Sequence, residues 1–111
     1  MDHRIEIVRS ILKDDLRAAL RIAELSQSVN ISSSRLRHLF KAETGHTLAQ
    51  HLKGIRLEEA QFLLRTTFLS VKEIMHHVGI TNASHFFHDF RDAFGLTPIQ
   101  CRAKSQKPRF D

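Results

Sequence analysis

The chain has 111 residues, enough for one domain or two very small ones, and this length excludes a large two-domain enzyme. It is 41% hydrophobic and 26% charged, so it can bury a core and is not compositionally disordered. Lysine and arginine number 17 against 12 acidic residues, and the resulting formal charge of +5 favours a polyanionic partner.

The cysteine content and the first residues bear on the compartment. A single cysteine, Cys101, excludes an internal disulfide and a CxxC site, as is typical of a reducing cytoplasm. The chain starts with charged residues where a signal peptide needs an apolar run, and no stretch reaches the ~18 apolar residues of a membrane span. We therefore expect a cytoplasmic protein without a membrane partner.

Apolar residues recur at helical spacing along nearly the whole chain, as at Ile5, Val8 and Leu12. Because runs of alternating polar and β-branched residues are missing, we expect an all-α fold. Arg21 is a poor N-cap, so we place the start of the second helix before it, at residue 18, or as early as Asp14. Seven helices are predicted, over residues 3–13, 18–28, 33–43, 47–65, 71–77, 82–94 and 98–103.

An internal repeat divides the chain into two similar halves. With a shift of 49, Glu24, Leu25, Val29, Asn30 and Ile31 correspond to Glu73, Ile74, Val78, Gly79 and Ile80. With a shift of 50, Leu36, Phe40, Lys41, Gly45 and Thr47 correspond to Phe86, Phe90, Arg91, Gly95 and Thr97. The repeat predicts one helix-turn-helix unit at 1–46 and another at 66–103, with a linker helix at 47–65 and a basic tail at 104–111.

Each half has the pattern of a helix, a tight turn and a second helix. Asn30 and Gly79 occupy the turns, because these residue types accept a left-handed backbone most easily. Gly45 and Gly95 are expected to cap the second helices at their C-terminal ends. Helices then restart at capping boxes, which are Thr47 with Gln50, Ser70 with Glu73, and Thr97 with Gln100.

The helix after the first turn is a candidate recognition helix for the DNA major groove, which is wide enough to admit an α-helix. Leu36, Leu39 and Phe40 form its inward stripe. Its outward stripe has positive or protonatable donors and no acid, which suits contacts to phosphates and base edges, although a solvated basic face is the alternative. The candidate DNA-binding residues here are Ser33, Ser34, Arg35, Arg37, His38 and Lys41.

The helix after the second turn is the corresponding candidate in the second half. Its inward side carries Phe86, Phe90 and Phe94. Phe87 corresponds to Arg37 and could touch a thymine methyl group, or it could instead widen the core. Asp89 and Asp92 make this face less basic than the first. The candidate DNA-binding residues are Asn82, Ser84, Phe87, His88 and Arg91.

Two other classes of function compete with DNA binding. A metal site could draw on His76, His77, His85 and His88, but zinc usually needs three or four ligands that these spacings do not supply together. A helical protein-interaction module explains the amphipathic helices but not the repeated turn residues. No nucleophile motif surrounds any serine, so we expect neither an enzyme nor a bound metal or cofactor.

Residues in both halves match the pattern of a known family. In the second half they are Glu73-Ile74, Val78-Gly79-Ile80, Ser84-His85-Phe86, Phe90-Arg91, Gly95 and Thr97-Pro98 through Arg102. In the first half they are Ile31-Ser32, Leu36, Phe40-Lys41, Gly45 and Arg56-Leu57 with Ala60. Over roughly residues 5–103 the chain resembles the double helix-turn-helix DNA-binding domain of AraC/XylS-type transcriptional regulators.

The resemblance implies a bacterial, sequence-specific regulator of transcription, more often an activator, with two homeodomain-like helix-turn-helix subdomains. It implies duplex DNA and RNA polymerase as partners. We expect the chain to bind two adjacent major-groove segments as a monomer, because an 18-residue linker helix spans roughly 27 Å, comparable to the ~34 Å repeat of the duplex. The family's usual sensing or dimerisation domain is missing here, which predicts either a stand-alone regulator or a fragment.

Three residues depart from the family pattern. They are Met75, where the family usually has alanine, Ile80, where it often has an aromatic residue, and Cys101, where it commonly has tyrosine. Met75 and Ile80 are interpreted as compensating changes within the core. Because position 101 is a cysteine, the last helix is expected to lack the aromatic side chain that would help to pack it.

Overall fold

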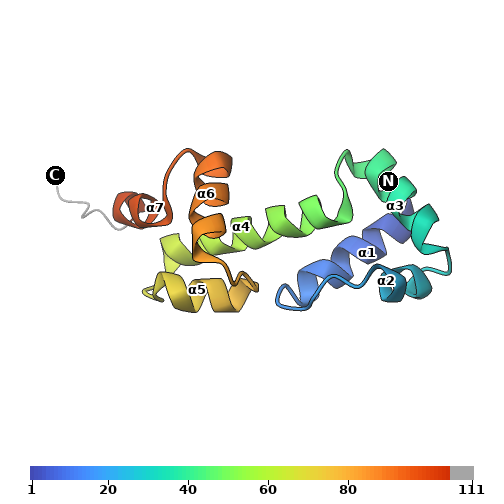
Figure 1. Ribbon diagram of the computed structural model, residues 1–111, viewed down its shortest axis with the longest axis horizontal. Helices are drawn as coiled ribbons and strands as arrows, with labels where there is room; N and C mark the ends of the chain where they lie inside the picture. The colour runs from blue at the N-terminus through green and yellow to red at the C-terminus, as the bar shows by residue number, and fades with distance from the viewer. Residues whose placement is uncertain (106–111) are drawn as a thin grey trace. The chain divides into compact units, whose positions relative to one another are not determined.

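A computed structural model describes residues 1–105, and within them the chain forms seven helices and no strands (Figure 1). These helices are α1 His3–Asp14, α2 Ile22–Ser28, α3 Ser33–Thr44, α4 Leu48–Thr66, α5 Val71–Val78, α6 Ala83–Phe94 and α7 Pro98–Ser105. The all-α class and the seven predicted helices are confirmed. The predicted basic tail lies outside the described residues from position 106 onward, and its first two residues, Lys104 and Ser105, belong to α7.

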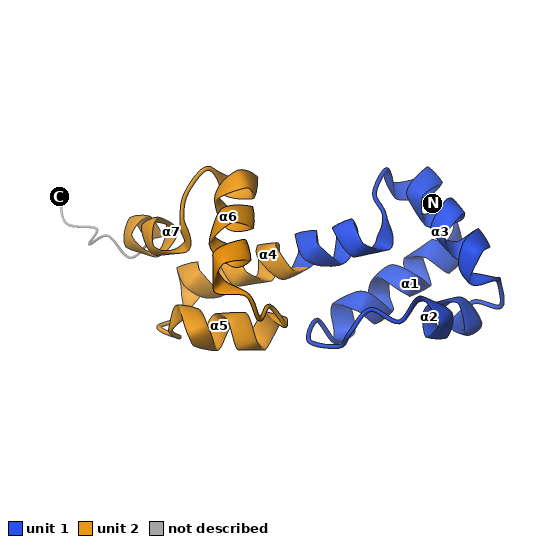
Figure 2. Ribbon diagram, viewed as in Figure 1, with its two compact units in different colours: residues 1–55 blue, residues 56–111 orange. Residues whose placement is uncertain are grey.

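The chain forms two compact units, which we call unit 1 (residues 1–55) and unit 2 (residues from 56 onward) (Figure 2). The boundary lies within α4, which continues through Gly54 without a break. Each unit buries its own apolar core. The core of unit 1 contains Ile5, Val8, Leu12, Leu25, Val29, Leu36, Phe40 and Leu48. The core of unit 2 contains Leu57, Ala60, Leu64, Ile74, Met75, Val78, Phe86, Phe90 and Cys101.

The two predicted turns have the left-handed backbone that their residues favour. Asn30 has φ 57° and Gly79 has φ 81°. The valine before each turn is buried, and the isoleucine after it is partly buried against the same core. The turn residue therefore reverses the chain while its neighbours fill the angle between two helices.

The predicted helix caps are also confirmed. Gly45 and Gly95 end α3 and α6 with φ 80° and 76°, and the amide of each donates to a carbonyl four residues earlier. At the restart of the chain, the Gln50 amide donates to the Thr47 hydroxyl at 3.1 Å, while the Gln50 side chain accepts from the Thr47 amide at 2.9 Å. Thr97 and Gln100 form the same pair at 3.2 and 3.0 Å before α7. Short polar sequences thus set where helices end and begin.

The capping box that begins α5 makes stability depend on pH. The Glu73 amide donates to Ser70 Oγ and the Ser70 amide donates to Glu73 Oε1, both at 3.0 Å. These hydrogen bonds from Ser70 lower the pKa of Glu73 below its ordinary value of 4.5. A carboxylate with a lowered folded-state pKa contributes stability above its ordinary pKa and loses it as pH falls through the folded-state pKa.

We therefore expect the melting temperature of the parent protein to fall more between pH 5 and about 3 than that of Glu73→Ala. Thermal melts across this pH range measure the difference. Glu24→Ala is the matched control, because Glu24 occupies the corresponding position in α2, where the N-cap makes no side-chain hydrogen bond. Equal pH profiles for the parent and Glu73→Ala would contradict the prediction.

The predicted start of the second helix is wrong. The prediction placed it at residue 18 or earlier, but α2 begins at Ile22, and Arg21 stands at the N-cap without a side-chain hydrogen bond. Leu20 and Ile22 both pack against the core of unit 1, and residues two apart on a helix do not share a face. The chain before Ile22 is therefore irregular, because core packing overrides the helix propensity of Ala18 and Ala19.

The last helix packs on unit 2 through a buried thiol and an arginine. Cys101 is buried in the core, so a small side chain occupies the position where the family pattern has tyrosine. Arg102 donates from Nε to the Leu64 carbonyl at 3.4 Å and from Nη2 to the Thr67 carbonyl at 3.3 Å. These bonds satisfy the Leu64 carbonyl in the last turn of α4, where helix carbonyls lack partners within the helix, and the Thr67 carbonyl just after it.

Candidate nucleic-acid interface

Helix α3 separates an apolar face from a basic one. Ser32 caps its start, accepting a hydrogen bond from the Arg35 amide at 3.1 Å. Leu36 and Phe40 are buried and Leu39 packs against the same core, which confirms the predicted inward stripe. Five of the candidate DNA-binding residues on α3 are exposed, and four of them line one hollow, which are Ser34, Arg37, His38 and Lys41.

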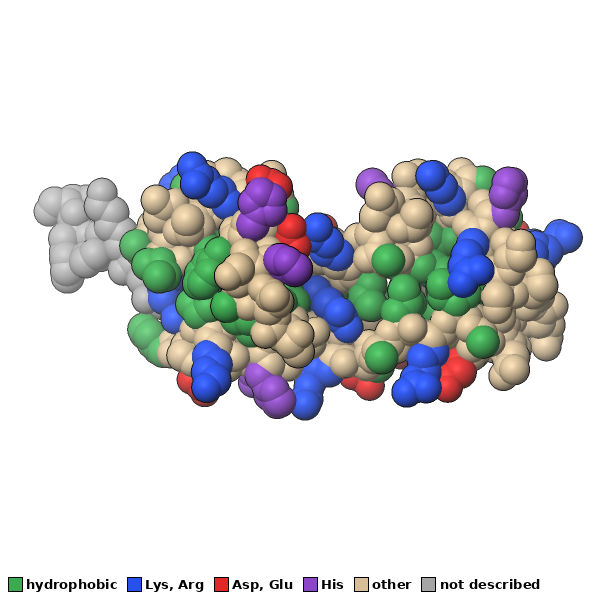
Figure 3. Space-filling model, viewed as in Figure 1, with side chains coloured by type: hydrophobic (Ala, Val, Ile, Leu, Met, Phe, Trp, Pro, Cys, Tyr) green, Lys and Arg blue, Asp and Glu red, His purple; other side chains and the backbone are tan. Residues whose placement is uncertain are grey.

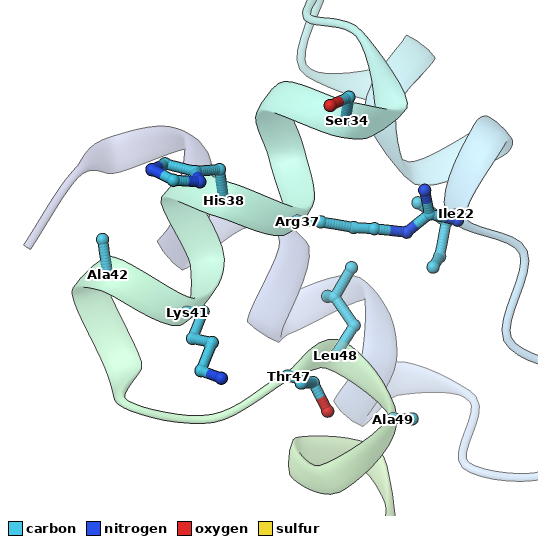
Figure 4. Close-up of a pocket in the computed structure, with 9 residues that line it drawn as sticks. All are labelled: Ile22, Ser34, Arg37, His38, Lys41, Ala42, Thr47, Leu48 and Ala49. Atoms are coloured by element: carbon cyan, nitrogen blue, oxygen red, sulfur yellow. The ribbon is translucent and has the colours of Figure 1, made fainter.

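These four exposed residues surround one hollow of about 680 Å³ in unit 1. Its lining also includes Ile22 at the start of α2, Ala42 on α3, and Thr47, Leu48 and Ala49 at the start of α4. The Arg37 side chain extends toward the start of α2 and the Lys41 side chain toward the start of α4 (Figure 4). On the face of unit 1 seen in Figure 3, exposed hydrophobic side chains are bordered by lysine and arginine. No aspartate or glutamate is among the lining residues.

Two further candidates on α3 lie apart from this hollow. Ser33 is half-buried, and its hydroxyl lies 3.2 Å from that of Ser26 on α2. Arg35 is exposed but does not line the hollow. The structure therefore brings Ser34, Arg37, His38 and Lys41 together at the hollow. The Ser33 side chain instead lies beside α2.

Helix α6 presents a different surface in unit 2. Asn82 caps it, with Oδ1 accepting from the His85 amide at 2.9 Å, so this side chain is already engaged. Phe86 and Phe90 are buried, while Phe87 is half-buried with its ring centre 5.9 Å from that of Phe86. Ser84, His88 and Arg91 are exposed.

The charges on α6 partly cancel. His88 Nε2 lies 3.2 Å from Asp92 Oδ2, and both side chains are largely exposed, at 75% and 68%. Histidine and acidic side chains lie side by side on the visible face of unit 2 (Figure 3). Helix α6 has one basic residue against two acidic ones, whereas α3 has three basic residues against one. Unit 1 therefore offers a polyanion the more favourable surface.

The structure also bears on two other kinds of interaction. Within residues 1–105, no three His, Cys, Asp or Glu side chains come together as a metal site would require. In the same part of the chain, no helix combines the length and apolar character needed to cross a membrane.

Sequence reasoning missed the part of the hollow that α2 and α4 supply. Ile22 and the residues at the start of α4 come from outside the recognition helix, and only the capping box at Thr47 marked where α4 begins. No local pattern indicates that Ile22 lies against α3, because that proximity arises from the packing of three helices.

Comparison with known proteins places this arrangement in a family. A family profile described as a helix-turn-helix domain matches residues 25–104, most of the chain. The transcriptional activator RhaR of an Enterobacter species is 30% identical over 96 residues, which cover 86% of this chain and 34% of RhaR. The chain spans about a fifth to about a third of the length of the regulators that it matches in sequence.

Solved structures share the same fold. A transcriptional regulator of AraC type from Chromobacterium violaceum has a TM-score of 0.86 at 26% identity, covering 95% of this chain and 94% of that one. The DNA-binding domain of AdpA, solved in complex with a target DNA, has a TM-score of 0.84 at 22% identity. The match covers 98% of this chain and 100% of that domain. The two helix-turn-helix subdomains, the profile match and the shared fold show that the chain belongs to the AraC/XylS-type family of helix-turn-helix DNA-binding domains, which are regulators rather than enzymes.

Proposed function

We propose that this chain binds duplex DNA in a sequence-specific manner and regulates transcription, as an activator. The observation that carries the proposal is the basic side of α3 at the hollow, where Arg37, His38 and Lys41 are all exposed and no acid is among the lining residues. Guanidinium and ammonium groups on a helix that fits the major groove can contact both phosphates and guanine edges. The relative named as a transcriptional activator supports the sign of regulation.

Each helix-turn-helix unit contributes one recognition helix to this function, α3 from the first and α6 from the second. The predicted linker helix at 47–65 joins them, so that one chain contacts two adjacent major-groove segments as a monomer. The duplication of the turn and of its cap residues supports this arrangement. Activation then requires a surface that contacts RNA polymerase. A protected region on DNA confined to half a helical turn, or a strict need for a palindromic site, would contradict the proposed mode of binding.

Salt dependence of binding tests whether DNA is the partner at all. We expect the affinity for a mixed-sequence duplex to fall linearly on a log–log plot against salt, with a slope of about 0.9 for each neutralised phosphate. Lys41→Gln should lower this slope by about 1 if Lys41 contacts a phosphate. Fluorescence anisotropy of a labelled duplex measures both quantities.

The matched control is Lys13→Gln, which removes one exposed lysine from the last turn of α1 that does not line the hollow. It should leave the salt slope close to that of the parent. Absence of DNA retention at low salt would contradict the proposed function and favour a protein-interaction module instead.

A further inference from the structure

The hollow beside α3 has features that contact with DNA does not require. Its volume of about 680 Å³ lies within the range of about 300 to 1,000 Å³ typical of small-molecule sites. Ile22 and Leu48 contribute apolar surface from two other helices, and the small side chains of Ala42 and Ala49 leave the space open. A phosphate would use only the cations, and a thymine methyl group could touch a single alanine but would not fill a hollow of this volume.

The charge at the hollow defines what kind of small molecule would fit. Arg37 and Lys41 line it from one helix and His38 lies beside them, with no acid in the lining. In Figure 4 the Arg37 and Lys41 side chains extend on either side of Leu48. A molecule with an apolar body and one carboxylate would place the body against Ile22 and Leu48 and the carboxylate against Lys41.

The second unit provides an internal comparison, because the repeat places different residues at the same positions. With the shift of 50, Phe87 corresponds to Arg37, Asp92 to Ala42 and Ile99 to Ala49. Asp92 holds a negative charge beside His88, and Ile99 is 66% exposed. Unit 2 thus has bulkier side chains and an acid where unit 1 has small side chains and a cation.

From these observations we infer that the hollow of unit 1 is a binding site for a small apolar monocarboxylate, and that this ligand and DNA exclude one another. The exclusion rests on the proposed function, because Lys41 would contact both and the ligand would occupy the space beside Arg37. The binding of the ligand itself does not depend on that function. Such a site would release the first unit from DNA when the carboxylate is present.

Fluorescence titration with naphthalene-2-carboxylate tests binding directly on the full chain. We expect saturable binding that weakens about two- to fivefold in Lys41→Gln, the range for loss of one exposed ion pair. Neutral naphthalene-2-methanol should bind more weakly than the carboxylate for the same reason. The matched control is Arg91→Gln, which removes the corresponding cation from α6 and should leave probe binding unchanged.

A second variant keeps the test independent of the removal of Lys41. Ala42→Asp combined with Ala49→Ile introduces into unit 1 the residues that unit 2 carries at these positions, so the change is compatible with the fold. Both alanines are exposed, and thermal melts verify that the variant folds. We expect it to lose saturable binding of the probe. Equal binding by this variant and the parent, or equal weakening by Arg91→Gln and Lys41→Gln, would overturn the proposed site.

The competition with DNA is measured separately, by adding the probe to the complex with labelled duplex. The probe should displace DNA from the parent at concentrations that saturate the hollow, and naphthalene-2-methanol should displace less. Probe binding without displacement would overturn the exclusion. DNA binding without probe binding would overturn the ligand site and leave the proposed function standing, whereas probe binding without any DNA binding would contradict the proposed function alone.

Discussion

Replacing Phe90 with alanine is expected to lower the free energy of unfolding by about 3 to 5 kcal/mol, the usual loss for a buried phenylalanine. Phe90 is fully buried, and its ring centre lies 5.7 Å from that of Phe86 and 4.7 Å from that of Phe94. Truncation removes both edge-on contacts and leaves a cavity in a close-packed core. Urea unfolding followed by circular dichroism measures the loss.

Phe40→Ala should have a loss of similar size in unit 1, because Phe40 is also fully buried and its ring meets that of His51 at 5.2 Å. Hydrogen exchange should locate the two effects in different units, since each phenylalanine belongs to a separate core. Phe68→Ala is the control, because Phe68 is 92% exposed and its removal should change stability by no more than about 0.5 kcal/mol. Melts of Phe40→Ala and Phe90→Ala that match the parent would show that both phenylalanines are misplaced.

Arg37→Ala is expected to lower the preference for a selected DNA site over random duplex by about 1 to 3 kcal/mol, the value of one bidentate contact to guanine. Arg37 is exposed on the basic face of α3, and its counterpart in the second unit is Phe87. An apolar ring discriminates between bases less than a bidentate donor does. Phe87→Ala should therefore change the preference little, and paired titrations of both variants measure it.

Arg37→Lys separates geometry from charge. Lysine keeps the positive charge but lacks the planar fork that forms two parallel hydrogen bonds, so this variant should retain binding to random duplex and still lose part of the preference. A larger loss of preference for Phe87→Ala than for Arg37→Ala would reverse the assignment of specificity to the first unit.

Local sequence determined where most helices begin and end. Asn30 and Gly79 accept the left-handed backbone, and the threonine–glutamine pairs before α4 and α7 satisfy amides at helix starts. Each of these effects acts within a few residues, so it can be predicted from short spacing alone. The apolar periodicity of α3 likewise indicated which face carries Arg37, because side chains three and four apart share a face of a helix.

Only the tertiary structure decided the start of α2 and the shape of the candidate site. Leu20 and Ile22 both contact the core of unit 1, which a helix through residue 18 does not allow, and no cap in the sequence signals this. The hydroxyl of Ser33 lies beside that of Ser26 for the same reason, since α2 packs against α3. The hollow combines residues from three helices. Its existence depends on contacts between segments distant in the chain, which packing sets and local spacing does not encode.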